Sequence, residues 1–340
     1  MNSAVDAKLF PACTIGAIVN GQTVTAYGGT YSYEDKRPVT DNSVFDVASL
    51  TKVLPTSCLA LKLIEDGRLG LRDDIANYLP EYKSKGDKVT VWNLLTHTVY
   101  YEFGYRLSSI GHLPPEKILQ AIYSAPARTS ASELTYTNSS SILLGLIVEK
   151  LYGQSLAAAG EEVFFRPLGM YQTGFEPLQF ADKQHVVPTE IHNARGLVHG
   201  EVHDESAFGL KPLATGTAGL FTTVPDLLKF AQMLLNGGEK SGQRYFRAET
   251  IRQMTTNQLL GKDVTGLGWE LGQPHFMGKY AKDIFGKTGF TGCLILINLD
   301  LESAIVILSN YIYPKRPQSF RPINDFRQKV ADLVFGSAAA

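Results

Sequence analysis

The amino-acid sequence changes its periodicity twice along the chain, and this order of patterns limits the folds that it can adopt. Near its start, "CTIGAIVNGQTVTAYGG" has the pattern of two strands joined at Asn20-Gly21, a dipeptide typical of two-residue hairpin turns. From Leu267 onward, four short β-rich segments are separated by turn residues: "LGWELG", "DIFGKTG", "CLILINLD" and "SAIVILSN". Strands at both ends of one chain indicate a sheet that is assembled from both termini.

The region between these strands is rich in helical patterns. The segment "DVASLTKVLPTSCLALKLIEDG" is predicted to form a helix that ends at Gly67, with Pro55 as a point where the helix can bend. Three further helices are expected in the middle third, over "PPEKILQAIYSA", "NSSSILLGLIVEKLYG" and "SLAAAGEEVFFRPLG". Thr223 is placed to cap the helix "DLLKFAQMLLNGG", and the amphipathic segment "PINDFRQKVADLVF" is predicted as the last helix.

These elements predict a fold of the α/β (α+β) class. It consists of a mostly antiparallel sheet built from both termini, flanked by helices, with an inserted helical subdomain. At 340 residues the chain can bury a large core, and we expect a single domain over 1–340. The sheet subdomain is predicted at about 1–78 and 205–340, and the helical subdomain at about 79–204.

Charge and hydropathy argue against some classes of partner. A formal net charge of −1 gives no electrostatic footprint for nucleic acid or for an anionic membrane. No apolar run reaches the roughly 18–20 residues that a membrane-spanning helix needs. A small-molecule or peptide substrate is the partner that remains, and the oligomeric state stays open.

The cysteines and the first residues bear on the cellular compartment. Cys13, Cys58 and Cys293 are widely spaced and form no C-x-x-C, which favours buried, reduced thiols over a disulfide framework or a zinc site. The segment "MNSAVDAKLFPACTIG" lacks the basic start and long apolar stretch of a signal peptide. We therefore expect a cytoplasmic protein for the sequence as it stands, and an extracytoplasmic one if a signal peptide has been removed.

Candidate chemistry begins with Ser49 and Lys52 in "FDVASLTKVLP". Residues three apart on a helix share one face, so the lysine amine can take the proton of the serine hydroxyl. Ser49 also lies in the first turn of its predicted helix, where its amide has no intrahelical acceptor and can donate to an oxyanion. The alternative is a polar first turn with a solvent-exposed lysine.

A second motif, Tyr136-Thr137-Asn138, lies in "ELTYTNSSS". A phenol close to two ammonium groups has a lowered pKa, because the positive field favours the phenolate. Tyr136 could then act as base during acylation and as acid toward the leaving group. The amide of Asn138 can bind a substrate amide or carbonyl, although Asn138 is also a good N-cap for the helix that follows.

The third motif, Lys287-Thr288-Gly289 in "GKTGFTG", has two interpretations. At a strand edge it offers a cation, a hydroxyl and a glycine that lets a ligand approach the backbone, and the Phe290 amide becomes a second oxyanion donor. Read as Ala281-x-x-x-x-Gly286-Lys287-Thr288, the same residues match a loosened P-loop, a nucleotide-binding motif. A P-loop needs a helix after it, whereas "GFTGCLILINLD" predicts a turn and a strand, so the strand edge is favoured.

The order Ser-x-x-Lys, Tyr-x-Asn, Lys-Thr-Gly resembles the penicillin-recognising serine hydrolases, which include β-lactamases and penicillin-binding proteins. With tyrosine in the second motif, the chain is most similar to the branch of class C β-lactamases, D-alanyl-D-alanine carboxypeptidases and esterases. The resemblance covers nearly the whole chain, through the phrases "YLPEY", "LLTHT", "LYGQSL", "RPLGM", "VHDESA" and "GTAGLFTT". It implies a β-lactamase/transpeptidase-like fold with the active site in the cleft between sheet and helices.

The resemblance also implies roles for the residues of the three motifs. Ser49 would be the nucleophile, and Lys52 and Tyr136 would transfer protons. Asn138, Thr288 and Gly289 would contact substrate, and Lys287 would bind both Tyr136 and a substrate carboxylate.

The function implied is a metal-independent serine hydrolase without a cofactor. It would act through an acyl-enzyme on a β-lactam, a D-Ala-D-Ala-type peptide or a small ester. The alternative is a penicillin-binding or sensory module that is acylated and never turns over.

Several residues depart from the family pattern or offer competing sites. Many relatives continue "LLTHT" with Ser-Gly, and here Val99-Tyr100-Tyr101 would either narrow the pocket or pack on the surface. His97 is interpreted as a satisfied structural histidine, because Lys52 and Tyr136 already supply the base. His199 and His203 have the i, i+4 spacing of a metal pair, with His192 nearby, but the glycines among them favour a loop over a metal site.

Overall fold

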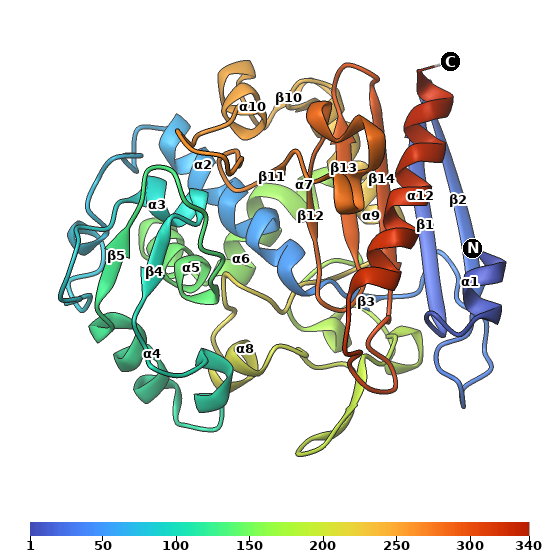
Figure 1. Cartoon of the computed structure of the whole chain (residues 1–340), viewed down its shortest axis with the longest axis horizontal. Coiled ribbons are helices and arrows are strands. Elements are labelled where there is room, and N and C mark those ends of the chain that lie inside the picture. The colour runs from blue at the N-terminus through green and yellow to red at the C-terminus, as the bar shows by residue number, and fades with distance from the viewer. Residues whose placement is uncertain (340) are drawn as a thin grey trace.

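A computed structural model describes residues 1–339, and a six-stranded antiparallel sheet lies in the right-hand half of the molecule as drawn in Figure 1. The strands stand in the order β11-β12-β13-β14-β1-β2. Their bounds are β1 (Ala12–Val19), β2 (Gln22–Gly29), β11 (Glu270–Leu271), β12 (Phe285–Thr288), β13 (Leu294–Asn298) and β14 (Ser303–Ser309). This order confirms the prediction of a sheet built from both ends of the chain.

The hairpin at Asn20-Gly21 forms as the sequence predicts. Both residues have positive φ, 50° and 73°, which is the backbone of a type I′ turn and matches the twist of the flanking strands. β1 then pairs on its other side with β14, from Cys13 opposite Ser309 to Ile18 opposite Ala304. The first long strand of the chain therefore lies beside the last one.

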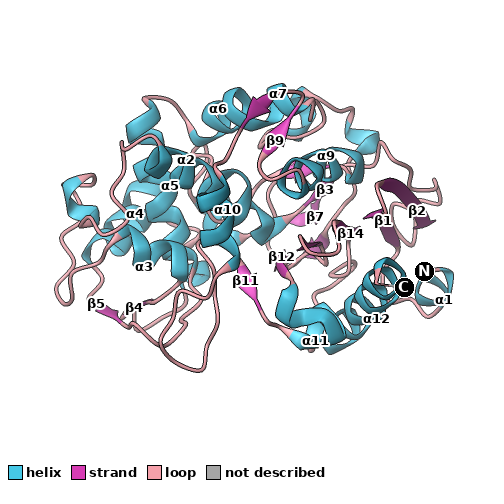
Figure 2. Ribbon diagram, turned by 90° about the horizontal axis from the view of Figure 1, so that it is seen from above, coloured by secondary structure: helices cyan, strands magenta, loops and turns pink. Residues whose placement is uncertain are grey.

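Both faces of the sheet are covered by helices, and this explains the continuous apolar runs of its central strands. Successive side chains of a strand point to opposite faces. Ile295 and Ile297 of β13 belong to the large core on one face, where α9 (Val224–Leu235) packs. Leu294 and Leu296 belong to the smaller core under α11 (Pro274–Met277) and α12 (Arg321–Ala338), on the opposite side in Figure 2.

A group of helices lies beside the sheet, at the left of Figure 1. It contains α2 (Cys58–Glu65), α3 (Val91–Thr96), α4 (Pro115–Ser124), α5 (Asn138–Tyr152) and α6 (Leu156–Gly160). The remaining short helices are α1 (Asn2–Asp6), α7 (Arg166–Leu168), α8 (Glu205–Gly209) and α10 (Ala248–Thr255). The subdomain bounds given above, about 79–204 for the helical part, stay a prediction.

Four pairs of very short strands were not expected from the sequence. They are β3 (Phe45–Asp46) with β8 (Phe221–Thr222), β4 (Val99–Tyr101) with β5 (Ala127–Thr129), β6 (Glu190–His192) with β7 (Gly196–Val198), and β9 (Glu239–Lys240) with β10 (Gln243–Arg244). Two or three residues are too few to show a period-two pattern, so sequence periodicity does not reveal them.

The helix predicted to run continuously up to Gly67 is broken. Residues Ala48–Lys52 form a 3₁₀ turn, the chain kinks within Val53–Ser57, and the regular helix α2 begins only at Cys58. Leu54 has extended backbone angles, φ −115° and ψ 116°. The residue before a proline is disfavoured in the helical region, so the bend expected at Pro55 is confirmed and the continuous helix is wrong.

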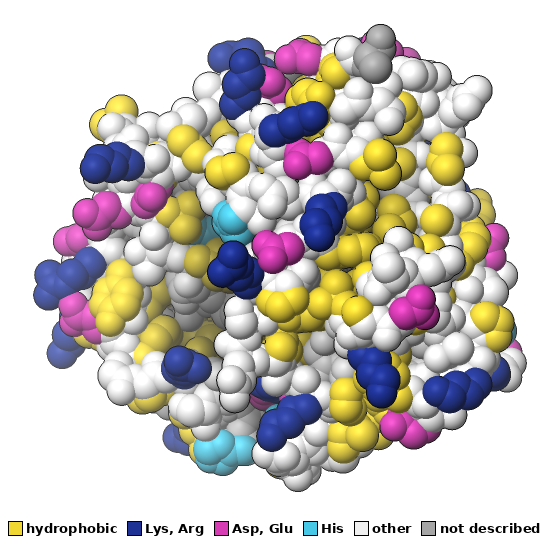
Figure 3. Space-filling view, turned by 45° about the vertical axis from the view of Figure 1, so that its right-hand side comes forward, with side chains coloured by type: hydrophobic (Ala, Val, Ile, Leu, Met, Phe, Trp, Pro, Cys, Tyr) yellow, Lys and Arg dark blue, Asp and Glu magenta, His cyan; other side chains and the backbone are white. Residues whose placement is uncertain are grey.

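The surface and the thiols agree with the composition. Cationic and anionic side chains are interspersed on the face shown in Figure 3. Within residues 1–339, no single helix has the length and apolar character to cross a membrane, and one helix pair bent by 75° passes by length and composition only. All three cysteines are free and buried, which confirms the expectation of buried thiols.

Candidate active site

The three motifs predicted to carry chemistry meet at one cavity of about 400 Å³. We call it the Ser49 cavity. Six of the predicted site residues line it: Ser49, Tyr136, Lys287, Thr288, Gly289 and Phe290. The other lining residues come from β11, α11, α12 and the segment before α12: Glu270, His275, Phe276, Phe320, Asn324 and Arg327.

Ser49 and Lys52 are in direct contact. Lys52 Nζ donates to Ser49 Oγ at 3.0 Å and to the carbonyl oxygen of Thr217 at 2.9 Å. The lysine side chain is buried, with 2% of the residue exposed. The alternative of a solvent-exposed lysine is therefore wrong, and the ammonium is held where it can exchange a proton with the serine.

A tight turn presents Ser49 to the cavity. The preceding residue, Ala48, has φ of +46°, a left-handed backbone that costs energy for a residue with a Cβ. The Ala48 amide donates to Asp46 Oδ1 at 2.8 Å, which helps to hold the turn. Ser49 is the second residue of the 3₁₀ turn, where backbone amides lack an acceptor within the turn.

Tyr136 lies between two ammonium groups. The centroid of its ring is 4.4 Å from Lys287 Nζ and 5.1 Å from Lys52 Nζ. Burial raises the pKa of the phenol, but the charges of Lys287 and Lys52 outweigh burial and bring the pKa below its ordinary value. The direction of this pKa shift is the one that the sequence predicts.

The ring of His97 packs beside that of Tyr136 at an interplanar angle of 42°. The two ring centroids are 4.9 Å apart. Burial, followed by the charges of Lys287 and Lys52, holds the pKa of His97 well below its ordinary value. Among residues 1–339 its Nδ1 has no hydrogen-bond partner, so the expectation of a satisfied histidine is wrong.

Gly289 brings the end of β12 against the turn that carries Ser49. A Cβ at this position would lie 2.4 Å from the carbonyl oxygen of Val47, so only glycine allows this approach. Arg327 of α12 holds the same turn, because its Nη2 donates to the carbonyl oxygens of Gly289 at 3.1 Å and Cys293 at 2.8 Å. In the part of the chain that the structure describes, the Phe290 amide donates to no protein group and is available to a ligand.

Like Lys52, Asn138 is a predicted site residue that does not line the Ser49 cavity. Its Nδ2 donates to Asp204 Oδ2 at 3.0 Å and to Ser206 Oγ at 3.2 Å. The N-cap of α5 is Thr137, whose hydroxyl accepts from the Ser139 amide, so the interpretation of Asn138 as the cap is wrong. A substrate contact of Asn138 stays a prediction.

Glu270 on β11 was missed by the sequence analysis. It lies opposite Gly286 on the neighbouring strand, and its Oε1 accepts from Lys287 Nζ in an ion pair inside the cavity. Burial lowers the pKa of Lys287, but Glu270 and then Tyr136 more than reverse this, and the net shift is upward. Lys287 is therefore an ammonium ion whose partner is already supplied by the chain.

The three histidines considered for metal binding are engaged separately. His203 Nε2 lies 2.7 Å from Glu190 Oε2, whereas His192 Nε2 lies 3.6 Å from Glu205 Oε1. His199 Nε2 contacts the carbonyl oxygens of Lys183 and Val186. Over residues 1–339, no cluster of three histidine, cysteine, aspartate or glutamate side chains is suitable for a metal ion.

Two further expectations concern the P-loop and the tyrosines of β4. Lys287 lies within strand β12, and the chain continues through a turn into β13, so the helix that a P-loop needs after it is not there. In β4, Tyr101 is buried in the core and Tyr100 is 52% exposed. Neither tyrosine lines the Ser49 cavity, so they do not narrow it.

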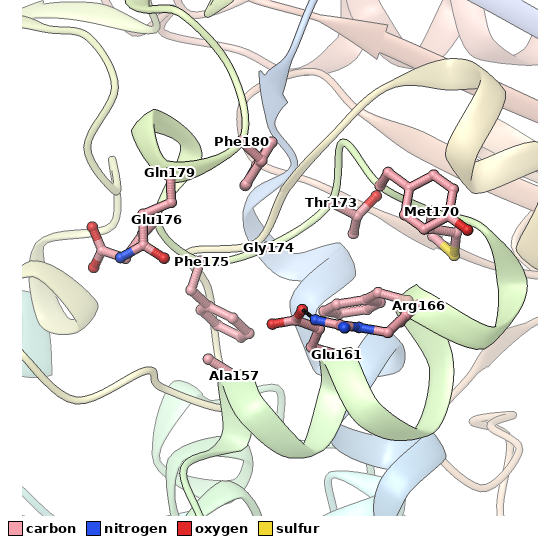
Figure 4. A pocket seen from close by; sticks show the side chains of 12 residues that line it. Ala157, Glu161, Arg166, Met170, Thr173, Gly174, Phe175, Glu176, Gln179 and Phe180 are labelled. Carbon is pink, nitrogen blue, oxygen red and sulfur yellow. Dashed lines mark hydrogen bonds and ion pairs between the residues drawn. The ribbon is translucent and has the colours of Figure 1, made fainter.

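A second cavity, of about 560 Å³, lies among α6, α7 and the segments next to them (Figure 4). Its wall includes an ion pair between Arg166 Nη2 and Glu161 Oε1 at 2.6 Å. None of the predicted site residues lines this second cavity, whereas six of them line the smaller Ser49 cavity.

Comparisons with known proteins agree with this geometry. A family model described as "Beta-lactamase" matches residues 2–328. A curated protein of Escherichia coli (strain K12) named "Putative D-alanyl-D-alanine carboxypeptidase" is 32% identical over 317 residues, which are 84% of this chain and 73% of that protein.

Solved structures share the fold. A class C beta-lactamase superposes with a TM-score of 0.75 at 22% identity, covering 97% of this chain and 93% of the other. EstCE1, described as a hydrolase with promiscuous acyltransferase activity, superposes with a TM-score of 0.76 at 18% identity, covering 96% of each chain.

Proposed function

The chain belongs to the Beta-lactamase family, and from this premise we propose that it is a metal-independent serine hydrolase that works through an acyl-enzyme. The observation that carries the proposal is the 3.0 Å contact between Lys52 Nζ and Ser49 Oγ at the wall of the cavity. A hydroxyl becomes a nucleophile when a base lies within hydrogen-bond reach of it.

The proposed reaction has two steps that use the same residues. Ser49 Oγ attacks the substrate carbonyl, and its proton passes to the Lys52–Tyr136 pair. The amides of Ser49 and Phe290 stabilise the oxyanion, an effect worth about 3–4 kcal/mol per donor in comparable hydrolases. Tyr136 then protonates the leaving group. In the second step it takes a proton from the water that attacks the acyl carbonyl, and this proton returns to Ser49 Oγ as the bond between Ser49 and the acyl group breaks.

The proposed substrates are a β-lactam, a D-Ala-D-Ala-type peptide or a small ester. All three offer a carbonyl carbon to the serine, and the fold does not decide among them. The names of the similar proteins support hydrolysis of this type, since they include a carboxypeptidase, a class C beta-lactamase and a hydrolase with acyltransferase activity. The lowered pKa of Tyr136 supports turnover over a module that is only acylated, because deacylation needs a base.

Ester turnover and mass spectrometry test the proposal together. We expect the purified protein to hydrolyse p-nitrophenyl acetate, and rapid quenching to trap an acetyl group on Ser49. EDTA should leave the rate unchanged, because the proposed groups are two amines and a phenol. Nitrocefin and a D-Ala-D-Ala peptide serve as parallel substrates.

Two outcomes would decide against this function. A stable penicillin adduct on Ser49 without any turnover would favour the sensory module. Absence of both turnover and adduct with all three substrate classes would refute the hydrolase.

The two lysines beside Tyr136 lead to a prediction about pH. If the phenolate is the active form, the rate rises with pH through the pKa of Tyr136. Of the two lysine charges that lower this pKa, that of Lys287 has the larger effect, and Lys287→Met removes it. The rising limb of the profile of kcat/KM against pH should therefore move to higher pH. Lys282→Met, a change at an exposed lysine outside the cavity, is the control. An unshifted profile in a folded Lys287→Met protein would contradict the role of Tyr136.

A further inference from the structure

The partner of Lys287 is the feature that bears most directly on which substrates the cavity accepts. In the resemblance to penicillin-recognising enzymes, this lysine would bind a substrate carboxylate. In the structure, the carboxylate of Glu270 already forms an ion pair with Lys287. We propose that Glu270 is a specificity-determining residue that selects against substrates carrying a carboxylate and in favour of uncharged or cationic ones. This inference rests on the proposed hydrolase function.

Two neighbouring strands bring the pair together. Glu270 lies opposite Gly286 in the pairing of β11 with β12, so Lys287 is next to its cross-strand neighbour. The side chain of Lys287 is 4% exposed and that of Glu270 is 25% exposed, and both line the Ser49 cavity. A substrate carboxylate that approached this lysine would have to share it with Glu270 or displace it.

Displacement and sharing are both unfavourable. Separating a largely buried ion pair leaves an uncompensated charge, which is costly in a poorly solvated site. Sharing places two carboxylates at one ammonium ion, where like charges repel each other at short range. The cavity therefore presents Lys287 as part of a neutral pair.

The second carboxylate oxygen of Glu270 indicates which substrate groups this side of the cavity favours. Oε2 is buried and has no hydrogen-bond partner among residues 1–339. A buried acceptor without a donor is unfavourable, and a bound group with positive charge or an N–H or O–H group would compensate for it. This favours cationic substrates and hydrogen-bond donors on this side of the cavity.

Arg327, the other cation that lines the cavity, is bound within the chain through two of its nitrogens, and its Nε is buried without an acceptor among residues 1–339. Arg327 is 2% exposed, and its Nη2 donates to two backbone carbonyl oxygens. Its Nη1 donates to Asn324 Oδ1 at 2.8 Å. Two of its three nitrogens thus support the turn after β12 and the start of α12.

The experiment uses three phenyl acetates that differ only in the meta substituent of the leaving group: methyl, carboxylate or trimethylammonio. For each ester, kcat/KM is measured with the wild type and with Glu270→Gln, so that the intrinsic reactivity of the ester cancels in the ratio. Glu239→Gln is the matched control, because Glu239 forms an ion pair with Arg244 away from the cavity. It should leave all three ratios unchanged.

We expect Glu270→Gln to raise kcat/KM for the carboxylate ester relative to the methyl ester by about 10-fold or more, the scale of a hydrogen bond to a charged group. The trimethylammonio ester should move in the opposite direction. The rising limb of the pH profile should move to lower pH, opposite to the shift expected for Lys287→Met, because the charge of Glu270 raises the pKa of Tyr136.

Equal ratios for the three esters would refute the role of Glu270, while ester hydrolysis through Ser49 would still support the hydrolase. Absence of both turnover and adduct in the wild type, with esters, β-lactams and D-Ala-D-Ala peptides alike, would refute the proposed function itself. A second measurement needs no variant: phenyltrimethylammonium should inhibit the wild type more strongly than benzoate does. Stronger inhibition by benzoate would overturn the inference.

Discussion

Replacing Ser49 by alanine should abolish hydrolysis of every substrate that the protein accepts. Loss of the nucleophile in a serine hydrolase lowers kcat on the order of 10⁶-fold. The side chain of Ser49 is half-buried and its hydroxyl accepts a hydrogen bond from Lys52, which keeps a second acceptor in Thr217. The variant should therefore stay folded, and steady-state kinetics together with thermal unfolding will show both results.

The control for this variant is Ser124→Ala. Ser124 lies at the exposed end of α4, and its hydroxyl donates only to the carbonyl oxygen of Gln120. It should keep wild-type kinetics. A Ser49→Ala protein that is folded and keeps more than about a tenth of wild-type activity would contradict the assignment of the nucleophile.

Tyr136→Phe should lower kcat/KM by about 10²- to 10⁴-fold, the range typical of a general acid–base group. Phenylalanine keeps the ring that packs beside Lys287 and His97 but removes the hydroxyl to which we assign the proton transfers. Because Tyr136 is proposed to serve both steps, acylation and deacylation should both slow. Stopped-flow measurement of the burst and of the steady-state rate with p-nitrophenyl acetate separates them.

Tyr100→Phe provides the matched control for the loss of a phenol. Tyr100 is 52% exposed on β4 and lies outside the Ser49 cavity. Its replacement should change neither rate. If Tyr136→Phe retained the wild-type kcat/KM, Lys52 alone would have to transfer the protons.

Sequence patterns predict the fold well where they are local. The hairpin at Asn20-Gly21 and the strands of "CLILINLD" and "SAIVILSN" need only a turn dipeptide or an apolar run of the right length. The break at Leu54 is different. Proline indicates that a bend is possible, but packing of distant segments decides whether the chain takes it.

The site divides in the same way. Ser49, Lys52, Tyr136 and Lys287 belong to short motifs, so each can be found without knowing its neighbours. Glu270 has no motif, and its importance comes from the neighbouring position of β11 beside β12 and from the ion pair with Lys287. Arg327 likewise reaches the turn after β12 only because α12 packs against the sheet. The orientation of the Asn138 side chain depends on its hydrogen bond to Asp204, 66 positions away in the chain.

The pairing of β1 with β14 has a consequence for how the chain acquires its structure. The Ala12 amide bonds to Asn310 Oδ1 across 298 positions, so one of the earliest strands must wait for one of the latest. Contacts between such distant positions slow folding, and apolar strand edges stay open in the meantime. Ser49 is synthesised long before Lys287, so a nascent chain has its serine but lacks the strand edge that completes the cavity. On the ribosome, catalytic competence should therefore arise late and together with closure of the sheet.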